Sequence, residues 1–144
     1  MESHVADITH VIQLAVAPVF LLTALATLIN ALNSRLGRIV DRRRVVAERL
    51  RSPGSEERGL LEEELANLLH RTRLIYFAIF SAVLGALLIC LVVAGAFVGA
   101  LITVDLARFV AVLFILAMLA TIAGLSMFLR EVFLAVTEGG QSLR

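Results

Sequence analysis

The sequence contains no lysine, and all thirteen of its basic residues are arginine. It has one cysteine, Cys90, inside an apolar run, which excludes an intramolecular disulfide framework. Asp, Glu and Arg are missing from the cores of three long apolar runs, Ile8–Ile29, Leu74–Ile102 and Leu106–Leu129. A helix needs about 20 mostly apolar residues to cross about 30 Å of hydrocarbon. Each run is therefore predicted to be a membrane-spanning helix.

The composition excludes an ordinary soluble domain. Hydrophobic residues make up 60% of the chain and the mean hydropathy is +0.94, whereas soluble domains are roughly 45–50% apolar. The chain is predicted to be one all-α membrane domain, residues 1–144, with spans at about 8–33, 74–102 and 106–129. The first run follows an acidic segment and is longer than the core of a signal peptide, about 7–15 residues, so a retained helix is expected.

Arginine placement predicts the topology. Residues 34–73, between the first and second spans, carry ten of the thirteen arginines, and Arg108 is the only arginine near the loop between the second and third spans. Loops rich in Lys and Arg remain in the cytoplasm. The segment 34–73 and the C-terminus are therefore expected in the cytoplasm, and the N-terminus outside.

The segment 34–73 is predicted to be an antiparallel helical hairpin that extends the first two spans. Its apolar residues follow alternating steps of four and three, the spacing of a coiled-coil seam. The seam positions are Leu32, Leu36, Ile39, Arg43, Val46 and Leu50 on the first arm, and Leu61, Leu65, Leu68, Thr72 and Ile75 on the second. A turn at Pro53–Gly54 brings two charged triplets level, Arg42, Arg43 and Arg44 against Glu62, Glu63 and Glu64.

Two interpretations of this hairpin remain open. It is either a rigid stalk for oligomer assembly or for docking a cytoplasmic protein partner, or a solvated connector between two membrane helices. Four of its arginines, Arg35, Arg38, Arg71 and Arg73, lie nearest the membrane. They are expected at the cytoplasmic mouth of a channel or against the phosphates of anionic lipid headgroups, because the planar guanidinium matches phosphate. A general preference for Arg over Lys explains the composition equally well.

The first span carries a polar face. Gln13, Thr23, Thr27 and Asn30 fall on one side of a helix. In lipid such a face must meet protein or water. It either lines the path of a homo-oligomeric channel for ions or small solutes, or forms hydrogen bonds with the other two spans.

Small residues in the other spans predict close helix packing, at Gly95 and Gly99 in the second and at Gly124 in the third. Asp105 is expected to cap the third helix. Enzyme chemistry has little support, because no Gly-rich phosphate loop and no Cys/His ligand spacing occurs in the sequence. No catalytic residue, cofactor, metal or nucleic-acid partner is expected.

Two stretches of sequence carry a resemblance to a known family. They are Pro18-Val-Phe-Leu-Leu22, and Arg35-Leu-Gly-Arg38-Ile-Val-Asp41-Arg42. They resemble an uncharacterised bacterial family, a domain of unknown function, of small three-span inner-membrane proteins. The resemblance implies a multi-pass protein of the bacterial inner membrane and no particular activity. Three hypotheses remain: a homo-oligomeric channel lined by the first span, a non-conducting scaffold or accessory subunit that docks a partner, and a membrane enzyme.

Overall fold

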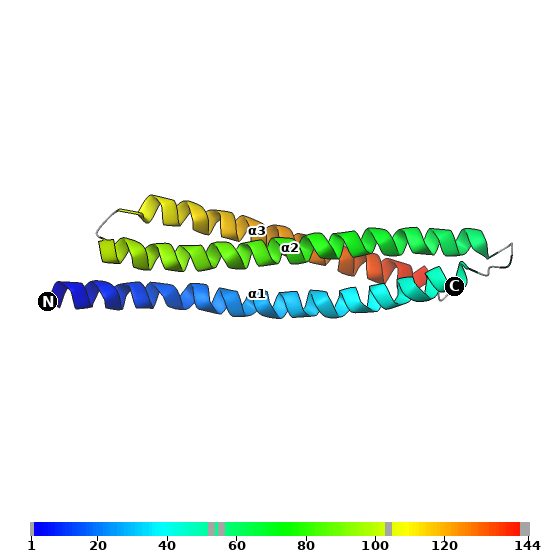
Figure 1. Cartoon of the computed structure of the whole chain (residues 1–144), viewed down its shortest axis with the longest axis horizontal. Helices are drawn as coiled ribbons and strands as arrows, with labels where there is room; N and C mark the ends of the chain where they lie inside the picture. Colours follow the sequence, from blue (N-terminus) through cyan, green and yellow to red (C-terminus); the bar gives the residue numbers. More distant parts are fainter. Residues whose placement is uncertain (1, 52–53, 55–56, 103–104, 142–144) are drawn as a thin grey trace. The chain divides into compact units, whose positions relative to one another are not determined.

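The described part of the chain forms three long helices (Figure 1). The computed structural model describes residues 2–51, 54, 57–102 and 105–141, with side chains described at 12–13, 16–51, 54, 57–102 and 105–137. In these ranges the structure is all-α: α1 is Glu2–Arg49, α2 is Arg58–Ile102 and α3 is Ala107–Gln141. Each helix is long and apolar enough to cross a membrane. The prediction of an all-α chain with three helices that have the length and composition of membrane spans is confirmed.

All three helices continue beyond the apolar runs that predict them. α1 passes through Pro18 and extends through the arginine-rich segment, so the predicted first span and the predicted first arm of the hairpin belong to one helix of 48 residues. α2 includes the predicted second arm and the predicted second span in the same way, over 45 residues. α3 continues to Gln141, whereas the third span is predicted to end at 129. Gly54 lies between α1 and α2, and Pro53 lies outside the described residues.

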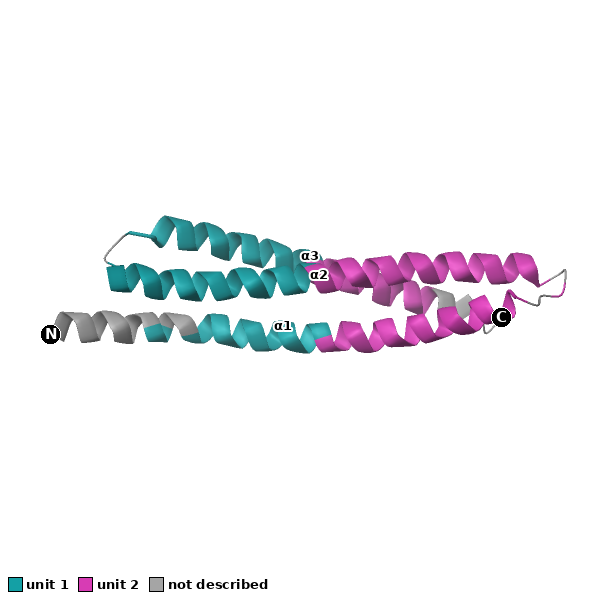
Figure 2. Cartoon of the chain, in the orientation of Figure 1, with its two compact units in different colours: residues 1–29, 81–123 teal, residues 30–80, 124–144 magenta. Residues whose placement is uncertain are grey.

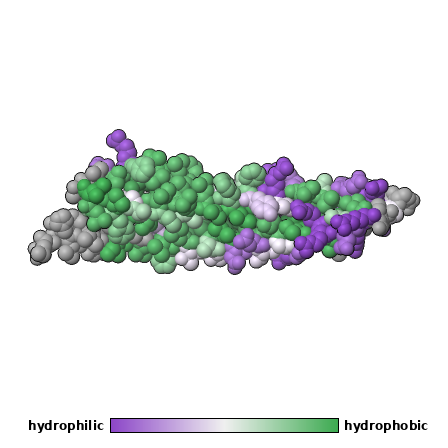
Figure 3. Space-filling view, in the orientation of Figure 1, coloured by the Kyte–Doolittle hydropathy of each residue, from purple (hydrophilic) through white to green (hydrophobic). Residues whose placement is uncertain are grey.

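The helices contribute to two compact units (Figure 2). Unit 1 consists of Met1–Ile29 and Ser81–Ala123, and unit 2 consists of Asn30–Phe80 and Gly124–Arg144. Figure 3 shows apolar side chains over the helices of unit 1, and most of the polar side chains in view over those of unit 2. Large apolar side chains of unit 1 are exposed, as expected for a surface that faces lipid; they include Phe20, Leu101, Phe109 and Ile115.

The core of unit 1 combines leucine and isoleucine with alanine. Leu25 of α1, Ala82 and Ile89 of α2 and Ala117 of α3 are buried and form one cluster. Small side chains at such a contact let the helix backbones approach closely, which is the usual basis of helix association in membranes. Asp105 caps α3 as predicted, because its Oδ1 accepts a hydrogen bond of 3.1 Å from the backbone N–H of Ala107.

The core of unit 2 follows the seam positions. Leu32, Ile39 and Val46 are buried on α1 at a spacing of seven residues. Leu68, Thr72 and Ile75 are buried on α2, and the Thr72 hydroxyl donates a 2.7 Å hydrogen bond to the Leu68 carbonyl oxygen. The remaining seam positions are half-buried: Leu36, Arg43, Leu50, Leu61 and Leu65. Glu131 of α3 is also buried in this unit.

Candidate functional site

The most distinctive site in unit 2 is a carboxylate shared by two arginines from different helices. Arg35 Nη1 of α1 donates a 2.6 Å hydrogen bond to Glu131 Oε2 of α3. Arg71 Nη2 of α2 donates a 3.0 Å hydrogen bond to Glu131 Oε1. Each carboxylate oxygen therefore binds one guanidinium, and the three side chains link all three helices. We call this set of residues the Arg35–Glu131–Arg71 junction.

Burial of the junction increases from the arginines to the glutamate. The side chain of Arg35 is 30% exposed, that of Arg71 16% and that of Glu131 2%. An ionised carboxylate with so little access to water is tolerated only when paired and hydrogen-bonded. The two guanidinium groups meet this requirement. Removing one partner from a buried ion pair costs about 3–5 kcal/mol, because the other charge is left uncompensated.

An aromatic ring fixes the position of one of these guanidinium groups. The Arg35 guanidinium carbon lies 5.2 Å from the centre of the Phe128 ring. Phe128 precedes Glu131 by three residues, so both lie on the same face of α3. A cation over an aromatic face gains about 0.5–2 kcal/mol, depending on solvent exposure. Arg35 is thus held by two groups of α3.

Beside the junction is an arginine-lined cleft of about 330 Å³. It is lined by residues of all three helices: Arg35, Arg38, Ile39 and Arg42 of α1, Leu68 and Arg71 of α2, and Glu131 and Ala135 of α3. The α1 arginines are separated by three and four residues and so share one helix face. We refer to this space as the arginine cleft.

The structure brings together three of the four arginines predicted nearest the membrane. Arg35, Arg38 and Arg71 line the arginine cleft, whereas Arg73 is exposed and is not among the lining residues. Arg73 follows Arg71 by two residues, about 200° around a helix, so the two side chains leave α2 on opposite sides. The partner of Arg35 and Arg71, Glu131, is a site residue that we did not predict.

One cross-helix ion pair joins the two predicted triplets. Arg42 Nε and Nη2 each lie 2.7 Å from Glu64 Oε1. Glu62 lies instead 3.6 Å from Arg58, one turn earlier on α2. The other triplet residues differ in exposure: Arg43 is half-buried, and Arg44 and Glu63 are exposed. The register of these two helix segments thus places Arg42 level with Glu64.

The predicted polar face of α1 is exposed throughout. The side chains of this face are all exposed: Gln13, Thr23, Thr27 and Asn30. The Thr23 hydroxyl donates to the Val19 carbonyl oxygen at 3.2 Å, and the Thr27 hydroxyl donates to the Thr23 carbonyl oxygen at 3.0 Å. The two threonines are therefore satisfied within α1, and the two carboxamides carry the remaining hydrogen-bonding capacity of this face.

Two glycines of α2 make close contacts with α3 in unit 1. A Cβ atom at Gly95 would lie 3.2 Å from Val110 Cγ2, and one at Gly85 would lie 2.9 Å from Thr121 Oγ1. The contact at Gly95 agrees with the predicted packing role of this glycine, and the closer contact at Gly85 is one that the sequence pattern does not indicate. Gly99 is half-buried and Gly124 is buried. Which glycine meets α3 depends on the rotation of α2, and that rotation is set by tertiary packing.

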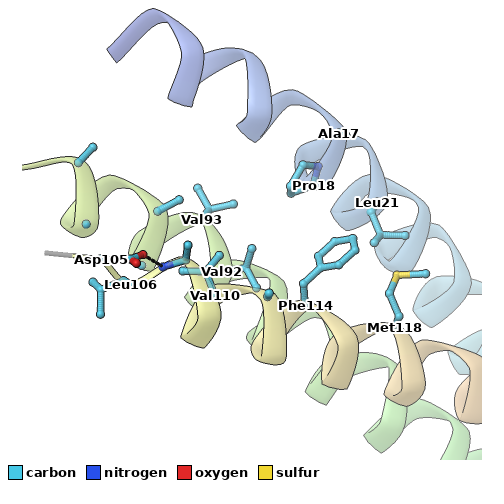
Figure 4. Close-up of a pocket in the computed structure, with 16 residues that line it drawn as sticks. Ala17, Pro18, Leu21, Val92, Val93, Asp105, Leu106, Val110, Phe114 and Met118 are labelled. Atoms are coloured by element: carbon cyan, nitrogen blue, oxygen red, sulfur yellow. Dashed lines mark hydrogen bonds between the residues drawn. The ribbon is translucent and has the colours of Figure 1, made fainter. Parts of the chain in front are cut away.

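Unit 1 also contains an apolar groove of about 820 Å³ (Figure 4). Pro18 and Leu21 of α1 lie on one side, and Phe114 and Met118 of α3 lie across from them. Asp105 is the acidic residue of the lining, and its carboxylate is engaged in capping α3. In the described part of the chain, no group of three or more His, Cys, Asp or Glu side chains has an arrangement that could hold a metal ion.

A family model matches residues 15–139, and its description is "Protein of unknown function (DUF2721)". The chain belongs to this family. The resemblance drawn from the Pro18–Leu22 and Arg35–Arg42 stretches to a domain of unknown function is therefore confirmed. No curated protein and no solved structure matches the chain. The matched range includes all three residues of the Arg35–Glu131–Arg71 junction and the whole lining of the arginine cleft.

Proposed function

We propose that this DUF2721 protein is a homo-oligomer in which the polar faces of the α1 helices meet and leave a path for ions or small solutes. The observation that supports the proposal is the orientation of α1. Leu25 and Leu32 of α1 are buried, whereas the four polar residues of its other face are exposed. Within one chain, α2 and α3 therefore cover the apolar side of α1.

Exposed carboxamides are the part of this face that needs a partner. Gln13 and Asn30 each have two N–H donors and a carbonyl acceptor, and a polar group left unpaired in hydrocarbon costs several kcal/mol. A second copy or a column of water supplies those hydrogen bonds. Asn30 follows Gln13 by 17 residues, about 25 Å at 1.5 Å per residue, which approaches the roughly 30 Å of the hydrocarbon core. The two carboxamides thus suit the two ends of one path.

The arginine distribution supports an orientation for this path. We place the N-terminus outside and the C-terminus in the cytoplasm of a bacterial cell, with the protein in the inner membrane, because residues 34–73 hold most of the arginines. Arg38, exposed on α1, then lies near the cytoplasmic mouth. A ring of such cations raises the local concentration of anions. The path is expected to be weakly anion-selective.

A second candidate function is a non-conducting scaffold or accessory subunit that docks a cytoplasmic partner through unit 2. It is favoured by the intrahelical hydrogen bonds of Thr23 and Thr27, which remove the need for water along the middle of the face. It is also favoured by Arg35, whose guanidinium binds Glu131 and Phe128 instead of pointing into an open mouth. Neither function requires catalysis.

Assembly is tested by disulfide cross-linking. Thr27→Cys in a chain whose Cys90 is replaced by Ala should give cross-linked dimers in membranes, because the α1 faces are close to one another. Val112→Cys is the matched control: Val112 is exposed on α3 and outside the proposed interface. Equal cross-linking at both positions, or none at Thr27→Cys, would contradict assembly through α1.

Conduction is tested by anion and cation flux into liposomes that contain the purified oligomer. Asn30→Leu should reduce flux without preventing the cross-linking through Thr27→Cys, and Thr27→Leu should reduce flux without changing the size of the oligomer in size-exclusion chromatography. Ser126→Leu is the control, since it replaces an exposed hydroxyl on α3. An assembled but silent oligomer contradicts the path and leaves the scaffold as the function.

A further inference from the structure

The charges around the arginine cleft do not balance. Four arginines and one glutamate line the cleft, which gives a formal charge of +3. Glu64, the partner of Arg42 outside the lining, lowers the total to +2. The cleft therefore concentrates positive charge in a recess that is partly shielded from solvent, where each charge interacts more strongly than in bulk water.

The local structure keeps three of the four guanidinium groups in place. Arg35 is held by Glu131 and the Phe128 ring, Arg71 by Glu131, and Arg42 by Glu64. Arg38 is exposed, and among the described residues no carboxylate oxygen lies within 4.0 Å of it. Arginines held in this way lose little entropy when they bind a ligand. The three arginines that surround Arg38 are thus preorganised.

We propose that the arginine cleft binds a phosphate group, with Arg38 as the main ligand and Arg35 and Arg42 beside it. The guanidinium group donates two parallel N–H hydrogen bonds to phosphate oxygens, a geometry that an ammonium group does not provide. The volume of about 330 Å³ is within the range of ordinary small-ligand sites. The phosphate charge offsets the excess positive charge of the lining.

The place of the cleft along the helices indicates two sources for the phosphate. Arg35 follows the first apolar run by six residues, and Glu131 follows the third run by two, so the cleft lies at the depth where hydrocarbon gives way to headgroups. A phospholipid headgroup reaches it from the membrane side, and a free phosphate or soluble phosphate ester reaches it from water. The chemistry is shared, and the two sources are separable by experiment.

The test uses the full chain in uncharged dodecyl maltoside micelles and isothermal titration calorimetry. One arm titrates dioctanoyl phosphatidylglycerol, with dioctanoyl phosphatidylcholine for comparison. The other titrates sodium phosphate against sodium chloride of equal ionic strength. Arg38→Gln should weaken binding about tenfold, the effect of losing a charge-assisted hydrogen bond. Arg73→Gln, which removes an exposed charge outside the cleft, should leave binding within about twofold.

The outcomes separate the sources and test the site. Tighter binding of phosphatidylglycerol than of phosphatidylcholine, reduced by Arg38→Gln alone, supports a lipid headgroup. Binding of sodium phosphate with the same dependence on Arg38, and no preference between the lipids, supports a soluble phosphate. Equal weakening by Arg38→Gln and Arg73→Gln, or no binding in either arm, overturns the proposal. Arg38 is exposed, so Arg38→Gln should leave the melting temperature unchanged. Measuring that temperature verifies that the variant is folded.

Discussion

Gly85 of α2 faces Thr121 of α3 so closely that a Cβ atom added to the glycine would lie 2.9 Å from Thr121 Oγ1. Moving the threonine hydroxyl aside would break a hydrogen bond, because this hydroxyl donates to the Ala117 carbonyl oxygen at 2.9 Å. That carbonyl oxygen also lies 3.4 Å from the same Cβ position. The contact between α2 and α3 in unit 1 therefore depends on the missing side chain of Gly85.

Gly85→Ala is expected to destabilise the protein by about 1–3 kcal/mol, the usual cost of overpacking a tight contact. The matched control is Gly37→Ala on α1, where a Cβ meets nothing within 4 Å. That change should stabilise by about 0.5–1 kcal/mol, because alanine favours a helix interior more than glycine does. Thermal unfolding in detergent, followed by circular dichroism, measures both.

The double variant Gly85→Ala with Thr121→Ala identifies the cause of the destabilisation. It removes the Oγ1 atom that the new Cβ would meet, so it should be more stable than Gly85→Ala alone. A double variant no more stable than the single one would attribute the destabilisation to the Ala117 carbonyl oxygen or to the backbone.

Glu131→Gln is expected to lower the free energy of unfolding by about 3 kcal/mol, because the neutral amide no longer compensates Arg35 and Arg71 in a buried setting. The control is Glu62→Gln, because the Glu62 side chain is 64% exposed and, within the described residues, pairs with Arg58 alone. That change should cost less than about 1 kcal/mol. Unfolding in detergent with increasing urea compares the two. Similar losses in both variants would show that the Arg35–Glu131–Arg71 junction contributes no more than a surface pair.

A charge swap tests the register of unit 2 at Arg42 and Glu64. Reversing either residue alone should destabilise by up to about 1 kcal/mol, since the side chains are 51% and 36% exposed. The double reversal should recover part of that loss. Glu63→Arg is the control within the same triplet, because Glu63 is exposed and no charged partner within the described residues lies near it. A double reversal no better than the two single changes combined would mean that the pair is not formed.

Patterns within one helix made the fold predictable. The apolar runs indicate three spans, and the four–three spacing that includes Leu32, Ile39 and Val46 marks the residues buried in unit 2. These signals arise from helix geometry and hydrophobicity, which act over a few turns. The membrane supplies the rest of the constraint, because any helix in hydrocarbon must satisfy its backbone internally.

The Arg35–Glu131–Arg71 junction was not predictable in the same way. Its hydrogen bonds join residues 96 and 60 positions apart, and no periodicity relates positions on different helices. One signal was available: Glu131 is an acidic residue two positions beyond the third apolar run, at the membrane level of Arg35 and Arg71. Pairing opposite charges that lie at the same depth in the membrane would have matched Glu131 with Arg35 and Arg71. The polar face of α1 was visible in the sequence, but its exposure depends on which side of α1 meets α2 and α3.

The orientation of the chain is tested by labelling cysteines in intact cells with a membrane-impermeant maleimide. In a chain with Cys90→Ala, Ser3→Cys and Arg108→Cys should be labelled from outside, and Gly54→Cys only after the cells are made permeable. The expectation rests on the arginines, because ten of thirteen lie in residues 34–73 and such segments stay in the cytoplasm. Gly54 suits the test, since a side chain there meets nothing within 4 Å, and Arg108 is exposed. Labelling of Gly54→Cys in intact cells, with Ser3→Cys protected, would show that the topology is the reverse of the one predicted. It would also place the arginine cleft on the outer side of the membrane, where its phosphate ligand would come from the outer leaflet or the external medium.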